Sequence, residues 1–476
     1  MRRSLLIIFG LVLSILVNAH PWKPSHYVIV DTDGGIDDMR AITMLLASPD
    51  IRVLAITVSP GALNRENAYI KIKSLLNSFY HEGIPVGINR NSTFKSPNFV
   101  FPLKAVWGNE TGLNQDKAPD CFPLINNILS HEETQISFLC LGGLSTADIA
   151  ARDIPLFNKK IKEIIWSANG LSDTNGFNYN IDPKSASEVL KGVIPVRTVK
   201  GFGQDKLFNS TMLEEIGEIN TKYGEKFYSF FNSEVAKGHD FLYFVTDEAV
   251  PLFLQYPKYF KTDTAGRNSE SSLMKVNKPE EGMIRILKGE TVAKNQVIKD
   301  LPADPEFYSD DVKPSVNEII KKYGIDEWVS GVLANELHRH LGVFAIIGVK
   351  MGIRAREYFN TGVDEFSAVS FAGSTPPLSC MNDGIQVSTG ATPGHGLLTV
   401  RNDTVSSAIA EFTYMNRKIR LTLKPEIAEK ISSGLKEINY IYGLDSNIYW
   451  ELVRKNSIKY WRELDRHDIF DIKILK

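Results

Sequence analysis

The segment that decides the fold reads Tyr27-Val-Ile-Val-Asp31-Thr-Asp33-Gly-Gly-Ile-Asp37-Asp38, and its last eight residues hold four carboxylates. Its first four residues are apolar and rich in β-branched side chains, which predicts a short strand buried on both faces of a parallel sheet. The acids begin where that strand ends. Apolar residues then recur at helical spacing between positions 39 and 46, which predicts a helix with Asp37 or Asp38 at its N-cap.

The four acids are expected to share one site. Asp31 and Asp33 point the same way from an extended chain, and the two glycines that follow permit a tight turn that returns Asp37 and Asp38 towards them. Carboxylates gathered in this way repel one another unless a cation joins them, and oxygen ligands without His or Cys favour Ca²⁺ over Mg²⁺. The alternative is that each acid is a solvated cap or loop residue. Their position at a strand end favours a site, because ligands of α/β folds bind there.

The composition is that of a soluble globular protein with two or three domains. The chain has 476 residues, a formal net charge of −2 and 43% hydrophobic residues, so it is too long for a single ordinary core. The charge gives no reason to expect nucleic acid or a membrane surface as a partner. Three cysteines, Cys121, Cys140 and Cys380, are too few for a disulfide framework.

The N-terminus has the pattern of an export signal. Arg2 and Arg3 precede an apolar run from Leu5 to Val17, and the small residue Ala19 follows. We therefore expect residues 1–19 to be a secretory signal peptide, and the mature protein to be secreted or periplasmic and free of the membrane. The run is short for a transmembrane helix, and an uncleaved anchor is the alternative.

Strand-like and helix-like segments alternate through the first half of the chain. Further strands are predicted at Val53–Val58, Ile84–Ile88, Ile136–Leu141, Ile161–Trp166 and Val193–Val199. This alternation predicts an α/β domain over residues 25–300, with a mostly parallel, Rossmann-like open sheet covered by helices on both faces. The ends of all these strands would then meet along one edge of the sheet.

A change in amino-acid composition indicates a second domain. Residues 301–324, with several prolines and acids, are predicted to be a linker that ends in a helix-like run, Val316–Tyr323. Residues 325–476 have a centre rich in Gly, Ser, Thr and Pro, followed by strand-like segments at Ala408–Tyr414 and Lys418–Leu423. This block is predicted to be a smaller α+β domain.

Five motifs resemble those of the nucleoside hydrolases and occur in the order of that family. The acidic segment Asp31–Asp38 resembles the family signature, which usually has Pro where Gly34 stands. Trp107–Leu113 resembles the family's His-Gly-x-x-Gly-Leu loop, and Leu141–Ser145 resembles its Thr-Gly-Pro-Leu-Thr turn. Phe177–Pro183 resembles the family's Phe-Asn-x-x-x-Asp-Pro motif, and Thr246–Val250 resembles its late His-Asp motif. The resemblance covers residues 27–260 and implies the fold of the inosine-uridine preferring nucleoside hydrolases.

The resemblance implies a role for each matched residue. The Ca²⁺ ligands would be the carboxylates of Asp33, Asp38 and Asp247 and the backbone carbonyl of Leu141. Asp33 would also be the catalytic general base, while Asp37 would bind a ribose hydroxyl and Asn178 would contact the sugar. Asp31 would support the turn. Asp240, preceded by His239, is an alternative to Asp247 as the acid of the late motif.

The implied reaction is hydrolysis of the N-glycosidic bond of a ribonucleoside or a related ribosyl compound, which releases ribose and base. The sugar becomes oxocarbenium-like, so the site needs a water on one face of the ring and help for the leaving base on the other. Calcium would lower the pKa of that water, and a carboxylate would take its proton. Members of the family usually associate, so the resemblance also implies a homo-oligomer.

Two departures from the family concern the leaving base. Trp107 and Thr246 stand where the family often has histidines that protonate the base. Trp107 is expected either to stack on the base or to cover apolar surface. The missing imidazoles support an alternative function, a catalytically weakened protein that binds a ribosyl ligand and keeps the calcium site. A phosphatase of the haloacid dehalogenase type is disfavoured, because that class has Thr or Val where Gly35 stands.

Residues 325–425 resemble the E-like domains of formylmethanofuran dehydrogenase. The matching stretches are Leu337–Gly342, Gly348–Gly352, Ser379–Gln386 and Thr389–Gly396. His338 and His340, expected on one side of an extended segment, form with Cys380 a candidate site for Zn²⁺ or another transition metal. The alternative is that these side chains are hydrogen-bonded core or loop residues. The domain is expected to be an accessory to the hydrolase.

Overall fold

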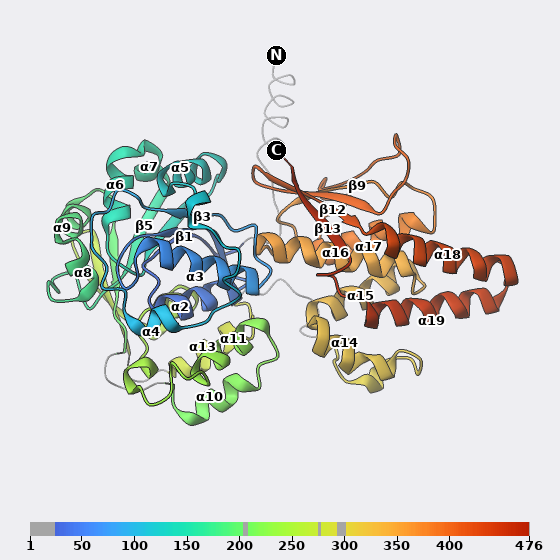
Figure 1. Cartoon of the computed structure of the whole chain (residues 1–476), viewed down its shortest axis with the longest axis horizontal. Coiled ribbons are helices and arrows are strands. Elements are labelled where there is room, and N and C mark those ends of the chain that lie inside the picture. Colours follow the sequence, from blue (N-terminus) through green and yellow to red (C-terminus); the bar gives the residue numbers. More distant parts are fainter. Residues whose placement is uncertain (1–23, 203–207, 275–277, 293–300, 476) are drawn as a thin grey trace, which may run out of the picture.

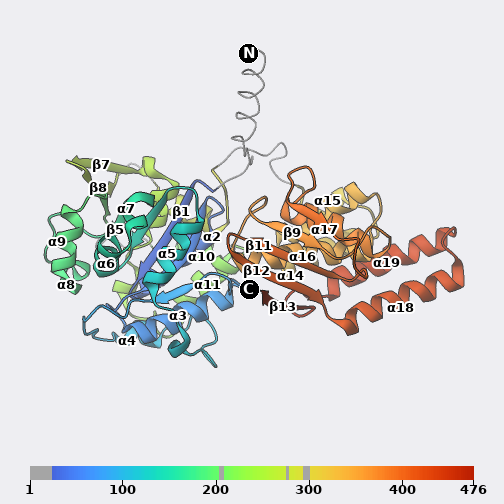
Figure 2. The same ribbon diagram turned by 90° about the horizontal axis from the view of Figure 1, so that it is seen from above.

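The computed structural model describes residues 24–202, 208–274, 278–292 and 301–475, and the predicted signal peptide lies outside these residues. They form two domains side by side (Figure 1), one built on an eight-stranded sheet and the other on a five-stranded sheet. A hairpin of two helices projects from the C-terminal domain, on the side away from the N-terminal domain (Figure 2).

The N-terminal sheet has the strand order β3-β2-β1-β4-β5-β6-β8-β7. Its strands are β1 (His26–Thr32), β2 (Ile51–Val58), β3 (Val86–Ile88), β4 (Ile136–Cys140), β5 (Ile161–Ser167), β6 (Val196–Val199), β7 (Phe260–Ala265) and β8 (Asn268–Leu273). All neighbouring strands pair in parallel except β7 and β8. The predicted mostly parallel α/β sheet is confirmed. The strand order reverses between β1 and β4, which is where open sheets of this kind bind ligands.

Strand β1 is buried on both faces. Val28 and Val30 pack in a core cluster that contains residues of α2 (Ile36–Ala47), α3 (Arg65–Ser78), α12 (Ala249–Gln255) and α13 (Pro279–Leu287). Ile29, between them, belongs to a second cluster with α5 (Cys121–His131), α6 (Ser145–Asp153), α7 (Pro155–Lys160) and α9 (Pro183–Lys191). Successive strand residues therefore pack against helices on opposite faces of the sheet.

The polar segment after residue 258 forms an edge hairpin that the sequence does not indicate. Strand β7 pairs antiparallel with β8, and β8 pairs in parallel with β6. After Phe260 the side chains of β7 are exposed. Polar side chains protect an edge strand from pairing with another chain. The same polarity conceals the strand in a search for apolar runs.

The C-terminal sheet has the order β10-β9-β11-β12-β13. Its strands are β9 (Ser367–Ser370), β10 (Leu398–Val400), β11 (Ile409–Tyr414), β12 (Arg417–Leu423) and β13 (Phe470–Leu475), and the principal helices are α15 (Ile325–His338), α16 (Val343–Phe359), α17 (Met381–Thr389), α18 (Pro425–Tyr442) and α19 (Asn447–Glu463). The predicted smaller domain of sheet and helices is confirmed. Helix α14 (Val316–Tyr323), in the range predicted as a linker, packs with Trp328 and Trp461 of this domain.

Buried polar contacts join the two domains. Arg52 of β2 forms an ion pair with Glu365, and both side chains are nearly inaccessible to solvent. Nδ1 of His81 lies 2.6 Å from the Glu357 carbonyl oxygen, and Nε2 lies 2.7 Å from the Tyr223 hydroxyl. The C-terminal domain therefore packs on β2 and on the connection between α3 and β3.

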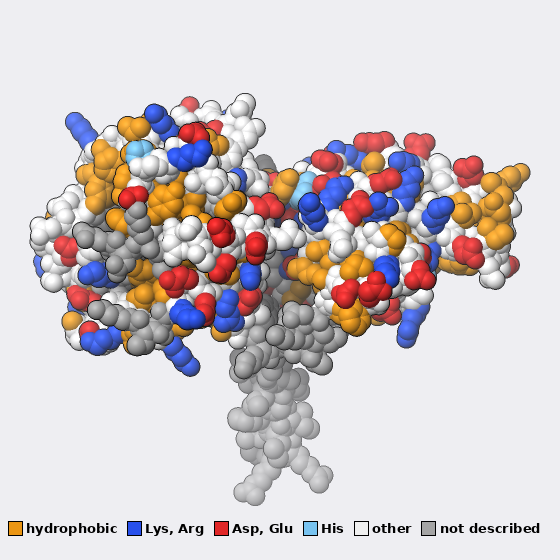
Figure 3. Space-filling view, turned by 90° about the horizontal axis from the view of Figure 1, so that it is seen from below, with side chains coloured by type: hydrophobic (Ala, Val, Ile, Leu, Met, Phe, Trp, Pro, Cys, Tyr) orange, Lys and Arg blue, Asp and Glu red, His pale blue; other side chains and the backbone are white. Residues whose placement is uncertain are grey.

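On the face shown in Figure 3, hydrophobic side chains gather on the N-terminal domain, on the adjacent part of the C-terminal domain and at the tip of the projecting hairpin. The exposed residues at the tip include Tyr440, Ile441, Tyr442 and Leu444. Among the helices that the structure describes, none combines the length and the apolar character needed to span a membrane.

Candidate active site

Asp31 lies near the end of β1 and ties this strand to β2. Its carboxylate accepts hydrogen bonds from the hydroxyls of Thr57, at 2.5 Å, and Ser59, at 2.9 Å. The side chain is fully buried, and burial raises the pKa of Asp31 to about 7. Asp31 is not among the residues that line the cavity described below. Its contacts are those of a residue that supports the strand end.

The turn after β1 depends on Gly34. Its backbone φ is +79°, in the left-handed region that suits glycine, and an added Cβ would lie 2.8 Å from the Cβ of Ala68. Gly35 is the N-cap of α2 and makes no side-chain capping bond. Asp37 and Asp38 therefore lie in the first turn of the helix. The prediction that one of them is the N-cap is wrong, because the helix begins at Ile36, directly after the turn.

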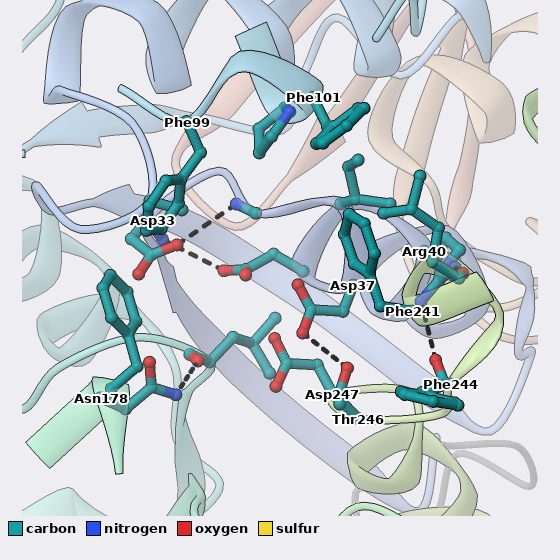
Figure 4. A pocket seen from close by; sticks show the side chains of 18 of the residues that line it. Asp33, Asp37, Arg40, Phe99, Phe101, Asn178, Phe241, Phe244, Thr246 and Asp247 are labelled. Atoms are coloured by element: carbon teal, nitrogen blue, oxygen red, sulfur yellow. Dashed lines mark hydrogen bonds between the residues drawn. The ribbon is translucent and has the colours of Figure 1, made fainter. Parts of the chain in front are cut away.

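Asp37, Asp38 and Asp247 form a compact acidic group, with one carboxylate oxygen of each within 4.8 Å of the others. Figure 4 shows Asp37 and Asp247 close together, with the Thr246 hydroxyl donating a 2.5 Å hydrogen bond to Asp37. Burial and the charge of Asp37 raise the pKa of Asp38 to about 6. Burial and repulsion by Asp37 and Asp38 raise the pKa of Asp247 well above its usual value. A divalent cation would relieve this repulsion.

Asp33 lines the same cavity. Its Oδ1 accepts a 3.2 Å hydrogen bond from the backbone N–H of Gly35, and its side chain is buried. Burial, with repulsion by Asp38 and Asp37, raises the pKa of Asp33 well above its usual value. The family resemblance predicts Asp33 among the metal ligands and Asp37 at the sugar. The group within 4.8 Å instead contains Asp37 and not Asp33.

Leu141, whose backbone carbonyl is the predicted fourth metal ligand, also lines the cavity. Asn178, on α8 (Phe177–Ile181), donates hydrogen bonds from Nδ2 to this carbonyl, at 2.6 Å, and to the Ser167 carbonyl, at 3.0 Å. The predicted sugar ligand thus contacts the predicted metal ligand (Figure 4). Leu141 follows β4 and Ser167 ends β5, so both belong to the carboxyl edge of the sheet.

Arg40 connects α2 to the segment that precedes Asp247. Its side chain is 2% exposed and forms an ion pair with Glu248. It also donates hydrogen bonds to the carbonyl oxygens of Leu242, at 2.5 Å, and Phe244, at 3.1 Å. Arg40 is not among the residues predicted from the sequence. The signal that was available is a single cation among the largely apolar residues that follow Asp38 in this helix, where an unpaired charge is costly.

Aromatic side chains surround the acids in a cavity of about 720 Å³. They are Phe99, Phe101, Phe177, Phe241 and Phe244, from the start of α4 (Val100–Lys104), from α8 and from the segment before Asp247. The ring centroids of Phe99 and Phe177 are 5.6 Å apart, and those of Phe101 and Phe241 are 5.3 Å apart. Such a lining fits a small molecule with a flat apolar part and a polar part that reaches the acids.

Trp107 lies in the hydrophobic core and not at the cavity. Its side chain is 1% exposed and stacks on Phe230 of α11 (Lys222–Phe231), with the ring centroids 5.2 Å apart. It is absent from the cavity lining. This corrects the assignment of Trp107 to the substrate: of its two expected roles, the residue has that of covering apolar surface. The aromatic rings that lie beside the acids are instead those of the five phenylalanines that line the cavity.

His338, His340 and Cys380 meet in the C-terminal domain, where one ligand atom of each lies within 4.8 Å of the others. The two histidines do not lie on an extended segment as expected. His338 ends α15, and Arg339, with a φ of +65°, turns the chain so that the two imidazole centroids are 4.1 Å apart. The two histidines are therefore brought to the same side by a helix end with one left-handed residue, and not by an extended segment.

The surroundings of these histidines suit metal ligands. Nδ1 of His338 lies 2.6 Å from a carboxylate oxygen of Asp383, whereas its buried Nε2 has no hydrogen-bond partner within the described part of the chain. Burial, followed by the nearby His338, lowers the pKa of His340 and so favours the neutral imidazole that a metal ligand needs. A carboxylate behind a histidine that leaves the other nitrogen unpaired is the usual arrangement at metal sites. The residues therefore fit Zn²⁺ or a similar ion.

A family model described as "Inosine-uridine preferring nucleoside hydrolase" matches residues 28–303, more than half of the chain. The chain belongs to this nucleoside hydrolase family. A second model, described as "FmdE, Molybdenum formylmethanofuran dehydrogenase operon", matches residues 337–440. The predicted fusion of the two domains is confirmed, and so is the class of enzyme, an N-glycosyl hydrolase of the nucleoside hydrolase type.

Known nucleoside hydrolases are similar to the N-terminal domain. The inosine-uridine preferring nucleoside hydrolase of Leishmania major is 25% identical over 256 residues, which are 50% of this chain and 81% of that protein. The enzyme of the same name from Crithidia fasciculata is 24% identical and covers 41% of this chain and 66% of its own. The pyrimidine-specific ribonucleoside hydrolase RihA of Klebsiella pneumoniae is 24% identical, covering 36% and 58%. In the last two matches the chain spans less than two thirds of the relative.

Solved structures of nucleoside hydrolases are also similar. The inosine-uridine preferring enzyme of Bacillus anthracis is 18% identical, with a TM-score of 0.43, and covers 56% of this chain and 99% of its own. An inosine-guanosine nucleoside hydrolase is 18% identical, with a TM-score of 0.41, and covers 56% and 98%. Both likenesses concern little more than half of this chain.

This nucleoside hydrolase has no histidine among the cavity-lining residues that the structure describes. Thr246, at the histidine position of the late motif, donates its hydroxyl hydrogen to Asp37. Asp247, and not Asp240, joins the acidic group. His239 packs against Phe101, with ring centroids 4.4 Å apart, outside the lining.

Proposed function

We propose that this nucleoside hydrolase is an exported, calcium-dependent hydrolase of the N-glycosidic bond of ribonucleosides or of a related ribosyl compound. The observation that carries the proposal is the meeting of Asp37, Asp38 and Asp247 within 4.8 Å beside Asp33 at the carboxyl edge of a parallel sheet. A donor set made only of oxygen atoms is the kind that Ca²⁺ prefers. The bound ion would supply orientation and acidity to the attacking water.

The residues present fit the ion. Asp38 and Asp247 are common to the predicted ligand set and to the observed acidic group, and with Asp33 or Asp37 and the Leu141 carbonyl they would hold it. The raised pKa values of Asp38 and Asp247 are consistent with this assignment, because burial and the repulsion between neighbouring acids both disfavour the charged carboxylates, and a bound cation would offset these effects.

Asp33 would take the proton of the attacking water as general base. Its carboxylate lies in the cavity, and the raised pKa suits a group that accepts a proton during the reaction. Asn178 and the Asp37–Thr246 pair would position the sugar on the same side. The phenylalanine rings would exclude water from the base.

The test is release of free ribose by the purified full-length protein from inosine, guanosine, adenosine and uridine, with and without a calcium chelator. We expect release that is lost on chelation and restored by added Ca²⁺. Asp247→Asn should lose both calcium binding and activity, whereas Asp240→Asn, a control from the same segment, should keep both. Calcium binding without ribose release from any of these nucleosides would instead favour the alternative function, a ribosyl-ligand binding protein.

We propose that the C-terminal domain holds Zn²⁺ or another transition metal at His338, His340 and Cys380. The unpaired Nε2 of His338, fixed from behind by Asp383, supports this site. Elemental analysis of the full-length protein should find about one such ion per chain. His340→Gln and Cys380→Ser should each lose it, and Cys121→Ser, at a buried cysteine of the other domain, should keep it. Full metal content in His340→Gln would contradict the site.

Export and assembly complete the proposal. N-terminal sequencing of the protein recovered from its native host should begin near His20 if residues 1–19 are removed as a signal peptide. Sedimentation analysis should find a homo-oligomer, as the family resemblance implies. A protein that begins at Met1 would refute the predicted signal cleavage, and a monomer would refute the predicted homo-oligomer. Neither result would contradict the proposed reaction.

A further inference from the structure

The part of the cavity away from the acids is built from aromatic rings that face solvent. Phe99 is 44% exposed, Phe177 is 43% exposed and Phe241 is 52% exposed, although all three line the cavity. Exposed aromatic groups that border a cavity mark a place where a flat ligand covers them. In Figure 4 the rings stand around the carboxylates, so a ring bound between them would have its attached sugar at the acids.

The hydrogen-bond donors of the lining are already engaged. Among the described lining side chains, the neutral and cationic donors are Arg40, Asn178 and Thr246. Both amide hydrogens of Asn178 are directed to the carbonyls of Leu141 and Ser167. The hydroxyl of Thr246 is directed to Asp37, and Arg40 to Glu248 and two backbone carbonyls. In the proposed reaction the four carboxylates serve the calcium ion, the attacking water and the sugar. The base side therefore has no proton to give among the residues described.

This arrangement separates two kinds of ribosides. In a neutral nucleoside the C1′–N bond breaks with its electron pair on the base, so the base leaves as an anion unless a group protonates it. In a riboside with a cationic base the same electron pair neutralises the ring nitrogen, and the base leaves as a neutral molecule. In both cases the water oxygen bonds to C1′ and its proton passes to Asp33. Only the second kind needs no acid.

We propose that the preferred substrates are N-ribosides whose base already carries a positive charge, such as an N-ribosyl pyridinium or an N7-alkylated purine riboside. This inference rests on the proposed hydrolysis of ribosides at the same site. Two further features favour a cation. Asp33, Asp37, Asp38 and Asp247 carry four negative charges when ionised, and one Ca²⁺ offsets only two of them. The faces of the surrounding phenylalanine rings attract cations as well.

The test compares matched substrates that differ in the charge of the base. The full-length protein with Ca²⁺ is given guanosine and 7-methylguanosine at pH 6.5, and nicotinamide riboside and uridine as a second pair, with rates corrected for uncatalysed hydrolysis. We expect kcat/KM to be higher for the cationic member of each pair by about 100-fold or more, because general acid catalysis of a neutral base contributes roughly 10²- to 10⁴-fold. Phe241→Leu should reduce kcat/KM for the cationic substrates more than for the neutral ones.

Three outcomes separate this inference from the proposed function. A ratio below about tenfold in both pairs would overturn the preference for cations and leave the hydrolase intact, since general acids contribute at least about 10²-fold. If the protein hydrolyses inosine efficiently and His239→Gln loses this activity, His239, which packs against Phe101, is the general acid. That result would overturn the preference for cationic bases and leave the proposed hydrolase function intact. Absence of ribose release from every substrate would overturn the proposed function and the inference with it.

Discussion

Arg40 and Glu248, which are 208 positions apart in the sequence, form an ion pair in which neither side chain is more than 2% exposed. Arg40 lies two residues after Asp38, and Glu248 is the residue after Asp247, so the pair joins the two segments that carry the acidic group. The guanidinium also lies over the ring of Phe208, 5.2 Å from its centroid. A buried pair of this kind contributes chiefly to the position of the segments that it connects.

Replacing Arg40 by Met should lower the free energy of unfolding of the N-terminal domain by about 3–5 kcal/mol, because Glu248 would stay buried without its partner. The environment already raises the pKa of Glu248 to about 7, through burial, even with Arg40 beside it. Urea unfolding of the full-length protein measures the effect. The double variant with Glu248→Gln should recover part of the loss. Arg152→Met removes an exposed ion pair with Asp153 and should leave the midpoint unchanged. Wild-type stability in Arg40→Met would contradict the role assigned to the pair.

Thr246→Val should weaken calcium binding about tenfold or more, because a hydrogen bond to a charged acceptor contributes roughly 1.5–3 kcal/mol. The substitution keeps the shape of the side chain and removes the 2.5 Å hydrogen bond that holds Asp37 towards the acidic group. Calorimetric titration of the metal-free protein with Ca²⁺ measures the change. Thr246→Ser, which keeps the hydroxyl, should bind like the wild type. Equal affinities for the Val and Ser variants would exclude this contribution.

Asp33→Asn should lower kcat for ribose release by at least about 10²-fold, since the amide cannot take a proton from water. The same change should stabilise the calcium-free protein at neutral pH. The folded-state pKa of Asp33 is raised, so the unfolded chain releases this proton at lower pH, and ionisation costs folding free energy that the neutral amide avoids. Ribose assays and urea unfolding in chelator check the two effects. A variant with wild-type kcat would remove Asp33 from the reaction.

Much of the fold follows from the sequence because buried parallel strands are apolar along their whole length. The predicted Val53–Val58 lies within β2, and the predicted Ile161–Trp166 lies within β5. The prediction of a helix at Val316–Tyr323 matches α14 in its bounds. The β7–β8 hairpin could not be found in this way, because an exposed edge strand has no apolar face to reveal it.

The residues of the acidic motif could be placed at one site from sequence because the chain itself, through a strand end and a turn, brings them together. Trp107 and Arg40 depend on partners far away in the sequence, namely Phe230 and Glu248. No motif spacing contains that information. The turn between His338 and His340 depends on the left-handed backbone conformation of Arg339, which cannot be predicted from an arginine in the sequence.

His81 lies at the contact between the two domains, and we expect it to make this contact sensitive to acid. Its ring is 1% exposed and lies between the Glu357 carbonyl and the Tyr223 hydroxyl. Burial, followed by the positive charge of Lys222, lowers the pKa of His81 well below the usual 6.5. Below pH 6.5 the unfolded chain therefore binds a proton that the folded protein does not. The free energy of unfolding falls with decreasing pH until the folded-state pKa is reached, and His81 has no such effect at higher pH.

Between pH 6.5 and 5 the wild type should therefore lose up to about 2 kcal/mol more stability than His81→Gln, at about 1.4 kcal/mol per pH unit. Glutamine can still donate a hydrogen bond at this place but takes up no proton. Urea unfolding at half-unit steps from pH 7.5 to 5, at constant ionic strength, gives the two curves. His131→Gln, at an exposed ring on α5, should follow the wild type throughout. If the wild type and His81→Gln run parallel below pH 6.5, the folded protein protonates His81 as readily as the unfolded chain does, and the domain contact is not the acid-sensitive element.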